Sequence, residues 1–231
     1  MSYFTTKSEF NHDATRFFHF ITGFGDCTAL KQLIIAPTDI KPKLLALIEE
    51  EATHQEQGLI ILKANSLVDP DIIQALYHAS IKGCKIELII RGICTLKPAL
   101  KGVSENISVY SIIGKYLEHP RIFYFKHDTN ECYISSADLM PRNLIRRIEI
   151  MTPILEENLR QKIKQILSLQ LQDSKLRWRL KSSGEYKQIK SGAKEVNNHD
   201  ILEEYVTKIY DKAQKETPEY VSKLAKRVIK E

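Results

Sequence analysis

A chain of 231 residues is long enough for one domain with a buried core and a smaller appendage, and its 43% hydrophobic and 27% charged residues are ordinary for a soluble globular protein. No apolar stretch reaches the roughly 20 residues of a membrane-spanning helix, and the polar amino terminus is not a signal peptide, so we expect a cytoplasmic protein. The modest net charge of +5 suggests a polyanionic partner without identifying one.

The four cysteines are Cys27, Cys84, Cys94 and Cys132, and no pair of them has CxxC spacing. Three of them lie in or beside apolar runs that are typical of strands. We therefore expect reduced thiols in the core rather than a metal site or disulfides.

The first thirty residues contain a helical pattern over 13–21. Its aromatic stripe includes Phe17, Phe18 and Phe20, and such a stripe needs a surface to cover. Nothing before it in the sequence provides that surface. We therefore expect this helix to belong to the edge of a larger architecture.

Strands and helices then alternate along the chain. Apolar runs predict buried strands over 31–37, 59–62 and 85–90, separated by helical patterns over 41–57 and 71–82. Asp69 and Pro70 suit the start of the second of these helices, and Gly83 suits its end. The order predicts parallel strands joined by crossover helices.

Polar side chains follow two of these strands. Lys63 and Asn65 come at the end of the second strand, and Arg91 comes at the end of the third. Because ligands of parallel sheets collect at the carboxyl ends of the strands, we expect these side chains to share one site.

The remaining elements are less regular. Strands are expected over 108–113, 122–125, 132–135, 146–151 and 175–180, a helix over 156–171, a loop or short hairpin over 181–198, and one or two charged helices over 199–231, broken near Pro218.

A phosphate site is predicted around the fifth and sixth strands. Residues two apart in a strand point to the same side, so His119 and Arg121 are expected to face one space. This pairs an imidazole that titrates near neutral pH with a permanently charged guanidinium. Ser135 and Asp138 end the next strand, and Arg142 follows.

This spacing is similar to that of phospholipase D-type half-sites, which read His-x-Lys, four residues, Asp, and then Gly-Ser-x-Asn on the next strand. His119 fits, Arg121 stands in place of the lysine, and Ser135-Ser136-Ala137-Asp138 lies where Gly-Ser-x-Asn falls. Lys126 occupies the position of the aspartate, so the pattern is broken at one catalytic element.

Longer motifs indicate a more specific family. From about residue 33 to about residue 180 the chain resembles the C-terminal catalytic domain of bacterial polyphosphate kinases of the first type. The matching segments are Lys63–Asp69, Ile89–Cys94, Ser104–Ile107, Ser111–Ile113, Tyr116–His119, Tyr133–Asp138 and Met140–Leu144.

The resemblance implies a phospholipase D-like α/β fold, with a mixed sheet flanked by helices and a single half-site. It places that domain at residues 31–190. Residues 1–30 are then a remnant like the last helix of the preceding domain, and residues 191–231 form a helical tail.

The implied activity is reversible transfer of the terminal phosphoryl group of ATP to polyphosphate, through a phosphohistidine and with magnesium. Arg91 is implied to contact the nucleotide phosphates, and His119 to hydrogen-bond the transferring group or act as an acid. The other residues expected to bind phosphate or nucleotide are Arg121, Lys63, Asn65, Ser135 and Arg142.

In this family the phosphorylated histidine and the Mg²⁺ ligands lie in the preceding domain. The resemblance therefore implies that this chain holds half of an active site, with ATP or ADP and polyphosphate as substrates and the upstream domains as partners. No metal ligand is expected in the chain itself.

Two alternatives stay open at this point. One is a homodimeric phosphodiesterase or nuclease that pairs two His119 sites, against which Lys126 counts. The other is a non-catalytic module that binds polyphosphate or nucleotide. We expect no nucleic-acid partner for a kinase of this family, and the sequence leaves the oligomeric state open, homo-oligomers included.

Overall fold

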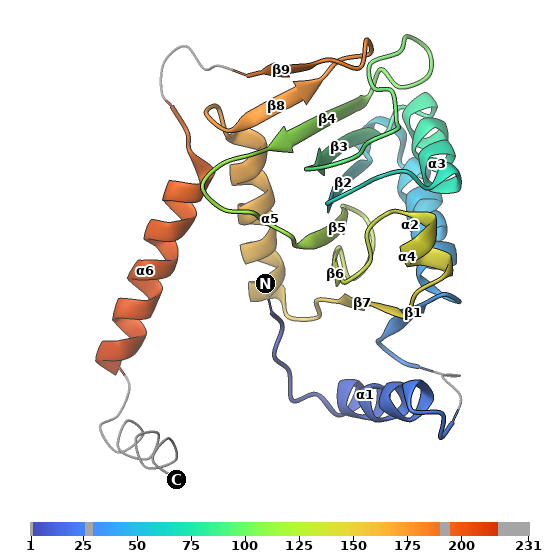
Figure 1. The fold of residues 1–231 in the computed structure, drawn as a ribbon, viewed down its shortest axis with the longest axis vertical. Coiled ribbons are helices and arrows are strands. Elements are labelled where there is room, and N and C mark those ends of the chain that lie inside the picture. The colour runs from blue at the N-terminus through green and yellow to red at the C-terminus, as the bar shows by residue number, and fades with distance from the viewer. Residues whose placement is uncertain (1, 26–29, 190–194, 217–231) are drawn as a thin grey trace.

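The computed structural model describes residues 2–25, 30–189 and 195–216, with side chains as far as residue 212. Its strands form one mixed sheet with helices on both faces (Figure 1). The expected fold class, a mixed sheet flanked by helices, is confirmed. None of the helices in these described ranges is long and apolar enough to cross a membrane.

The sheet has nine strands in the order β1-β7-β6-β5-β2-β3-β4-β8-β9. The strands are β1 (Ile34–Ala36), β2 (Leu59–Ala64), β3 (Lys85–Ile90), β4 (Ile107–Ile112), β5 (Arg121–Phe125), β6 (Cys132–Ser135), β7 (Glu149–Pro153), β8 (Arg177–Leu180) and β9 (Tyr186–Gln188). β2, β3 and β4 are parallel to one another, and every other neighbouring pair is antiparallel.

The helices are α1 (Ser8–Ile21), α2 (Ile40–Thr53), α3 (Pro70–Ile81), α4 (Pro141–Ile145), α5 (Glu157–Gln172) and α6 (Asn198–Glu216), with a short 3₁₀ turn at Gln55–Gln57. α2, α3 and α4 cover one face of the sheet, and α5 covers the other (Figure 1). α1 lies beyond the β1 and β7 edge, and α6 extends away from the sheet (Figure 1).

The core consists of two apolar layers, one on each face of the sheet. In β2, Ile60 and Leu62 point into the layer beneath α2 and α3, whereas Ile61 points toward α5. Because both faces are covered, the strand is apolar at every one of these positions. Each such fully buried aliphatic side chain contributes about 1.5–3 kcal/mol to the free energy of unfolding.

α3 begins where its sequence predicts. The carboxylate of Asp69 accepts hydrogen bonds from the main-chain N–H groups of Asp71 and Ile72, and Pro70 occupies the first helical position. Lys41 of α2 adds an ion pair of 2.9 Å to the same carboxylate. The cap therefore also joins the two helices on this face.

The parallel arrangement predicted from the alternating elements is correct for β2, β3 and β4. It is wrong for β1, which is not a neighbour of β2. β1 pairs antiparallel with β7 instead. The meander formed by β5, β6 and β7 lies between β1 and β2, and such a non-local insertion leaves no mark on the local pattern.

β1 is also shorter than the strand expected over 31–37. The main-chain N–H groups of Lys31, Gln32 and Leu33 donate to the buried carboxylate of Asp13 in α1. They therefore join no ladder, and the strand starts at Ile34. The same contacts fix α1 against the start of β1.

Two other boundaries differ from expectation. Residues 146–148 lie outside β7, which starts at Glu149, because residues 141–145 form the short helix α4 and the chain turns after it. β2 extends to Ala64, so that Lys63 lies inside the strand and not beyond its end.

The aromatic stripe of α1 is only partly covered within the described residues. Phe17 and Phe20 are half-buried, whereas Phe18 is 60% exposed. Phe10, in the earlier part of α1 that precedes the expected helix, is buried against Tyr3, with ring centroids 5.7 Å apart.

The strand expected over 175–180 is present as β8. The segment over 181–198, expected to be a loop or short hairpin, contributes β9, which pairs with β8, while its residues 190–194 lie outside the described residues. The charged segment after it forms α6, and the break expected near Pro218 lies outside the described residues.

The cysteines are free thiols where the structure describes them. Cys84 and Cys132 are buried and Cys94 is half-buried, as expected for core thiols. Burial raises the pKa of both Cys84 and Cys132 to about 12, so these thiols stay protonated near neutral pH. Cys27 is outside the described residues.

Candidate functional site

The candidate site lies on the segment that joins β4 to β5. β4 and β5 are separated in the sheet by β3 and β2, so residues 113–120 must cross the carboxyl ends of both strands. Polar residues at those ends are therefore brought beneath this segment, which carries His119 near its end. The site follows from topology, in the place where open sheets with parallel strands bind ligands.

Arg91 leaves the end of β3 and contacts this segment directly. Its Nη1 donates a hydrogen bond of 2.8 Å to the carbonyl oxygen of Glu118, the residue before His119. Its own carbonyl accepts from the hydroxyl of Ser111 at 3.1 Å. Arg91 is half-buried and lies on the side of this segment that faces Lys63 and Glu118, whereas His119 is exposed.

His119 lies just outside β5, which starts at Arg121, so strand geometry is not what makes the two side chains face one space. A strand is not needed to bring them together, because Nη1 of Arg121 lies 2.8 Å from Nδ1 of the imidazole. A guanidinium can only donate, so this contact requires an unprotonated Nδ1. Burial, followed by the charge of Arg121 and then that of Arg91, lowers the pKa of His119 from its ordinary value.

Arg121 is also engaged with a carboxylate. Its Nε and Nη2 donate to Asp138 at 3.1 and 2.8 Å, and Asp138 further accepts from the main-chain N–H of Asn65 at 2.7 Å. Although burial acts to raise it, the pKa of the Asp138 carboxyl is held below its usual range by Arg121 and by the N–H of Asn65. This ion pair joins the ends of β2, β5 and β6.

Lys63 lies beneath the segment and is buried. Its Nζ is 2.6 Å from Oε2 of Glu118 and 3.0 Å from Oε1 of Gln170 in α5. Burial lowers the pKa of this ammonium, while the negative charge of Glu118 acts in the opposite direction. The structure thus places Lys63 against protein groups and not at an open surface.

The other expected residues are spread around this edge. The hydroxyl of Ser135 donates to the carbonyl of Ile150 at 3.0 Å, and the side-chain amide of Asn65 donates to Ser66 at 3.1 Å. Arg142 is exposed in the first turn of α4. Ser135 lines the same hollow as His119 and Arg121, whereas Asn65 and Arg142 do not.

That hollow has a volume of about 430 Å³ and opens beside the imidazole. Its floor is formed by β6 and β7, including Ile134 and Thr152. The buried hydroxyl of Thr152 has no hydrogen-bond partner in the described part of the chain. Near its rim, the buried carboxylate of Glu149 accepts from Ser136 and from Asn143. An imidazole, a guanidinium and small hydroxyls thus surround a space large enough for phosphate groups.

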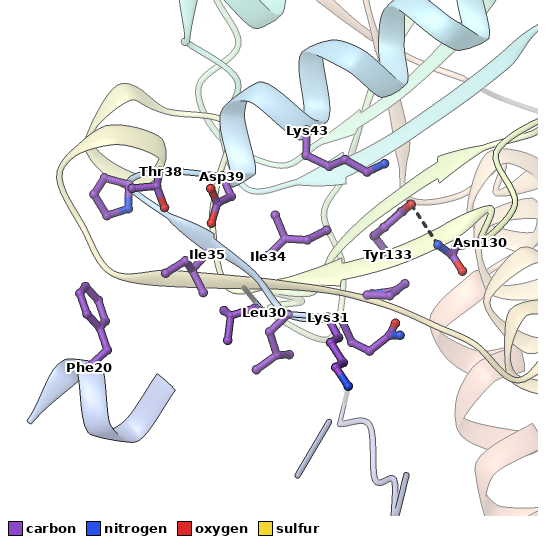
Figure 2. Close-up of a pocket in the computed structure, with 14 residues that line it drawn as sticks. Phe20, Leu30, Lys31, Ile34, Ile35, Thr38, Asp39, Lys43, Asn130 and Tyr133 are labelled. Carbon is purple, nitrogen blue, oxygen red and sulfur yellow. Dashed lines mark hydrogen bonds between the residues drawn. The ribbon is translucent and has the colours of Figure 1, made fainter. Parts of the chain in front are cut away.

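A larger hollow of about 770 Å³ lies on the opposite face of β6 and β7 (Figure 2). It is lined by Tyr133 and Pro153, which alternate along the strands with the residues of the first hollow. Lys31 and Lys43 contribute charge, and Asn130 donates to the Tyr133 hydroxyl. None of its described lining residues is a histidine or an arginine, so we take the His119 hollow as the candidate site.

Sequence reasoning did not identify Glu118, Gln170 or His199 as parts of this site. Their contacts join positions that are 52 or more residues apart, and no local motif records such pairings. Glu118 lies inside the Tyr116–His119 motif that resembles the family, but that motif does not reveal its contacts with β2, α5 and α6.

Residues 33–200 match the family model described as polyphosphate kinase C-terminal domain 2. The chain belongs to this family. The polyphosphate kinase resemblance in the sequence motifs is thereby confirmed.

Polyphosphate kinases are also the relatives found by sequence. The chain is 52% identical to a polyphosphate kinase of Campylobacter jejuni subsp. doylei over its whole length, and 49% identical to one of Helicobacter pylori over 91% of its length. It covers 33% and 31% of those proteins, so it spans about a third of the length of the curated relatives that it matches.

The fold agrees with this family as well. The crystal structure of polyphosphate kinase from Porphyromonas gingivalis aligns with 90% of this chain at a TM-score of 0.85 and 34% sequence identity. The alignment covers 33% of that polyphosphate kinase.

Proposed function

We propose that this chain is the C-terminal part of an ATP:polyphosphate phosphotransferase, in which Arg91 and His119 bind the phosphoryl groups. One observation carries the proposal. The guanidinium of Arg91 is hydrogen-bonded to the peptide group that precedes the exposed His119, so the position of a permanent cation is tied to that of the segment carrying the imidazole. Phosphoryl transfer depends chiefly on such positioning and charge neutralisation.

Arg91 supplies the fixed positive charge. A guanidinium is charged at every physiological pH and presents donors in a plane that fits phosphate oxygens. Its half-buried position makes its electrostatic attraction stronger than that of a fully solvated cation. In the proposed role it contacts the nucleotide phosphates.

His119 supplies a group whose proton depends on the ligand. Because its pKa is lowered in the free protein, the imidazole is mostly neutral near pH 7. An anion in the hollow favours the charged imidazolium and raises that pKa. The bound phosphoryl group therefore recruits a proton to His119, which then hydrogen-bonds the transferring group or acts as an acid.

The other residues expected to bind phosphate differ in how exposed their side chains are and in whether they already have a protein partner. We propose that Ser135, Asn65 and the exposed Arg142 assist at the rim of the site. Arg121 faces the same hollow but is shared with Asp138, so its charge is partly neutralised. Lys63 is buried against Glu118 and Gln170, so we assign it to the support of the 113–120 segment.

We further propose that the part of the relatives outside the matched third supplies the phosphorylated histidine and the Mg²⁺ ligands. ATP or ADP and polyphosphate are the proposed substrates, which favours the cytoplasm as the site of action. The described residues contain no group of three or more His, Cys, Asp or Glu side chains that could hold a metal ion, and we assign no step through magnesium to this chain.

A chimera tests the proposal. The matching third of the Campylobacter jejuni relative is replaced by this chain, and polyphosphate synthesis from ATP and Mg²⁺ is measured. We expect synthesis by the chimera, its loss in His119→Ala, its retention in His78→Ala, which alters an exposed histidine of α3, and none by the isolated chain.

Robust synthesis by the 231 residues alone would contradict the half-site proposal. Cleavage of a phosphodiester by the isolated chain, abolished by His119→Ala, would instead favour the phosphodiesterase alternative. In the structure Lys126, at the position of the missing aspartate, donates to the carbonyl of Gln57 at the far end of β5.

A further inference from the structure

Glu118 is held by groups from four separate elements. Its carboxylate oxygen Oε2 lies 2.6 Å from Nζ of Lys63 in β2 and accepts from Nε2 of Gln170 in α5 at 2.8 Å. Its Oε1 faces Nε2 of His199 in α6 at 3.6 Å, and its carbonyl accepts from Arg91 after β3. A residue adjacent to the candidate catalytic histidine is therefore fixed at both its side chain and its main chain.

The first turns of α6 hold the same segment at further points. Nδ1 of His199 accepts from the main-chain N–H of Tyr116 at 3.3 Å, and Lys115 forms an ion pair of 2.5 Å with Glu203. Gly114 lies so close that a Cβ there would be 2.9 Å from Nδ1 of His199. The segment and the base of α6 thus pack together over several consecutive residues.

The protonation of His199 follows from these contacts. Because Nδ1 accepts from a main-chain N–H, the proton of the neutral ring is on Nε2. That nitrogen is buried and has no hydrogen-bond partner within normal distance among the residues that the structure describes. It faces the carboxylate of Glu118. His199 itself is only 2% exposed, so its ring has little freedom to turn elsewhere.

α6 is in turn fixed to the body of the domain at its first residue. The buried carboxylate of Asp173, just after α5, accepts from the main-chain N–H and from the side-chain amide of Asn198 at 2.8 and 2.6 Å. It also accepts from the N–H groups of Lys175 and Leu176. The base of α6 is therefore a rigid support, although the rest of the helix extends away from the sheet (Figure 1).

We propose that Glu118 and His199 are positioning residues for His119, and that the base of α6 is part of the phosphoryl-transfer site. Lys63 and Gln170 complete the support from below. The inference rests on the proposed function of His119 as a phosphoryl-binding group. It extends that function to the first residues of α6, which lie at the end of the part of the chain that matches the family model.

A purely structural role for this cluster has a weaker physical basis. A buried ion pair such as that of Lys63 and Glu118 is often no more stabilising than apolar residues of the same volume. What the charged cluster does achieve is a defined orientation, because each contact is directional. Such an orientation matters where a misplacement of about 1 Å can cost two orders of magnitude in rate.

Hydrogen–deuterium exchange on the full 231-residue chain tests the proposal. In His199→Ala we expect the amides of 115–119 to exchange about tenfold faster, because their hydrogen-bonded support is lost, while β2 and β3 keep their protection. His199→Asn, whose amide oxygen can replace Nδ1 as acceptor, should restore part of the protection. Tyr210→Ala, on an exposed part of the same helix, is the matched control.

Affinity for tripolyphosphate gives the functional readout. We expect it to fall about tenfold in His199→Ala and Glu118→Gln, and to recover partly in His199→Asn. If Glu118→Gln does not fold because Lys63 is left without a counter-charge, the double variant Lys63→Met with Glu118→Gln removes both charges and should show the same loss of affinity.

The outcomes separate the two proposals. Unchanged exchange in 115–119, or faster exchange spread evenly over β2 and β3, would overturn the positioning role. Failure of the wild-type chain to bind tripolyphosphate, together with an inactive chimera, would instead contradict the proposed function. Exchange in His199→Ala would still decide in that case whether α6 orders the segment.

Discussion

Nη1 of Arg91 lies 2.8 Å from the carbonyl oxygen of Glu118, so the charge at the end of β3 is attached to the peptide group that precedes His119. This contact spans the gap between two strands that are not neighbours in the sheet. It links the position of the guanidinium to that of the imidazole, and displacement of one will disturb the other. The predictions below follow from this link.

Removal of the Arg91 charge should weaken anion binding. For Arg91→Gln we expect the affinity for tripolyphosphate, measured by calorimetry, to fall about 10- to 100-fold, the cost of one or two charge-assisted hydrogen bonds. Arg179→Gln removes the same charge from an exposed position on β8 and should change the affinity less than threefold by comparison, about the scale of a screened surface charge. Equal losses of affinity in Arg91→Gln and Arg179→Gln would show that tripolyphosphate responds only to the net charge of the chain.

The pKa of His119 should respond to both neighbours. It is lowered in the free protein by burial and by the charges of Arg121 and Arg91, so Arg91→Gln should raise it by removing a like charge. Bound tripolyphosphate should also raise it, because an anion favours the imidazolium. Ring resonances followed by NMR from about pH 5 to about pH 8 report both shifts.

The same linkage gives binding a pH dependence. An anion that raises the pKa of His119 must bind more tightly to the protonated form, so affinity should increase as the pH falls through that pKa. His119→Ala should remove this increase. An affinity that is independent of pH in the wild type would contradict the assigned role of the imidazole.

Asp138→Asn should destabilise the fold at the base of the site. It breaks the two-pronged pair with Arg121, and we expect a loss of about 1–3 kcal/mol in the free energy of unfolding, measured in urea. Asp71→Asn, which disrupts a more exposed ion pair with Lys41, should cost about 0–1 kcal/mol.

The lowered pKa of Asp138 also determines how its contribution to stability changes with pH. Its pKa is lower in the folded protein than in the unfolded chain, so its contribution is present above about pH 4 and is lost as the pH falls through the folded pKa. Wild type and Asp138→Asn should therefore converge in stability in acid. If the difference in the free energy of unfolding between wild type and Asp138→Asn stayed the same as the pH falls, the ionised carboxylate of Asp138 would not be its cause.

Gly114→Ala should separate α6 from the His119 segment. An added Cβ would lie 2.5 Å from Leu176 and 2.9 Å from Nδ1 of His199, so we expect a loss of about 1–3 kcal/mol in stability. Gly25→Ala, where the nearest atom is at 3.8 Å, is the control. Equal stability of Gly114→Ala and the wild type in urea unfolding would contradict the tight packing of this segment.

Local sequence patterns predicted much of this molecule, because the features concerned depend on near neighbours. The bounds of β3 and β6 follow from apolar runs, the start of α3 follows from Asp69 and Pro70, and Arg91 lies at the end of its strand as expected. Each of these depends on only a few consecutive residues.

Local sequence patterns do not predict features that depend on contacts between residues far apart in the chain. Lys63 was expected at an open strand end, but Glu118 and Gln170 cover it, and they lie 55 and 107 residues further along the chain. The register that buries Lys63 depends on the crossing of the 113–120 segment, which no periodicity records. For the same reason no local pattern indicates that the base of α6 packs against the His119 segment.

The most direct test is a crystal structure of the chain soaked with tripolyphosphate. We predict anion density that extends from the hollow beside β6 across the His119 segment toward the end of β3, with phosphate oxygens within hydrogen-bonding distance of both the Arg91 guanidinium and the His119 imidazole. Tripolyphosphate bound at a site that neither side chain reaches, or an empty hollow at saturating anion, would contradict the claim that these two groups share a phosphoryl ligand.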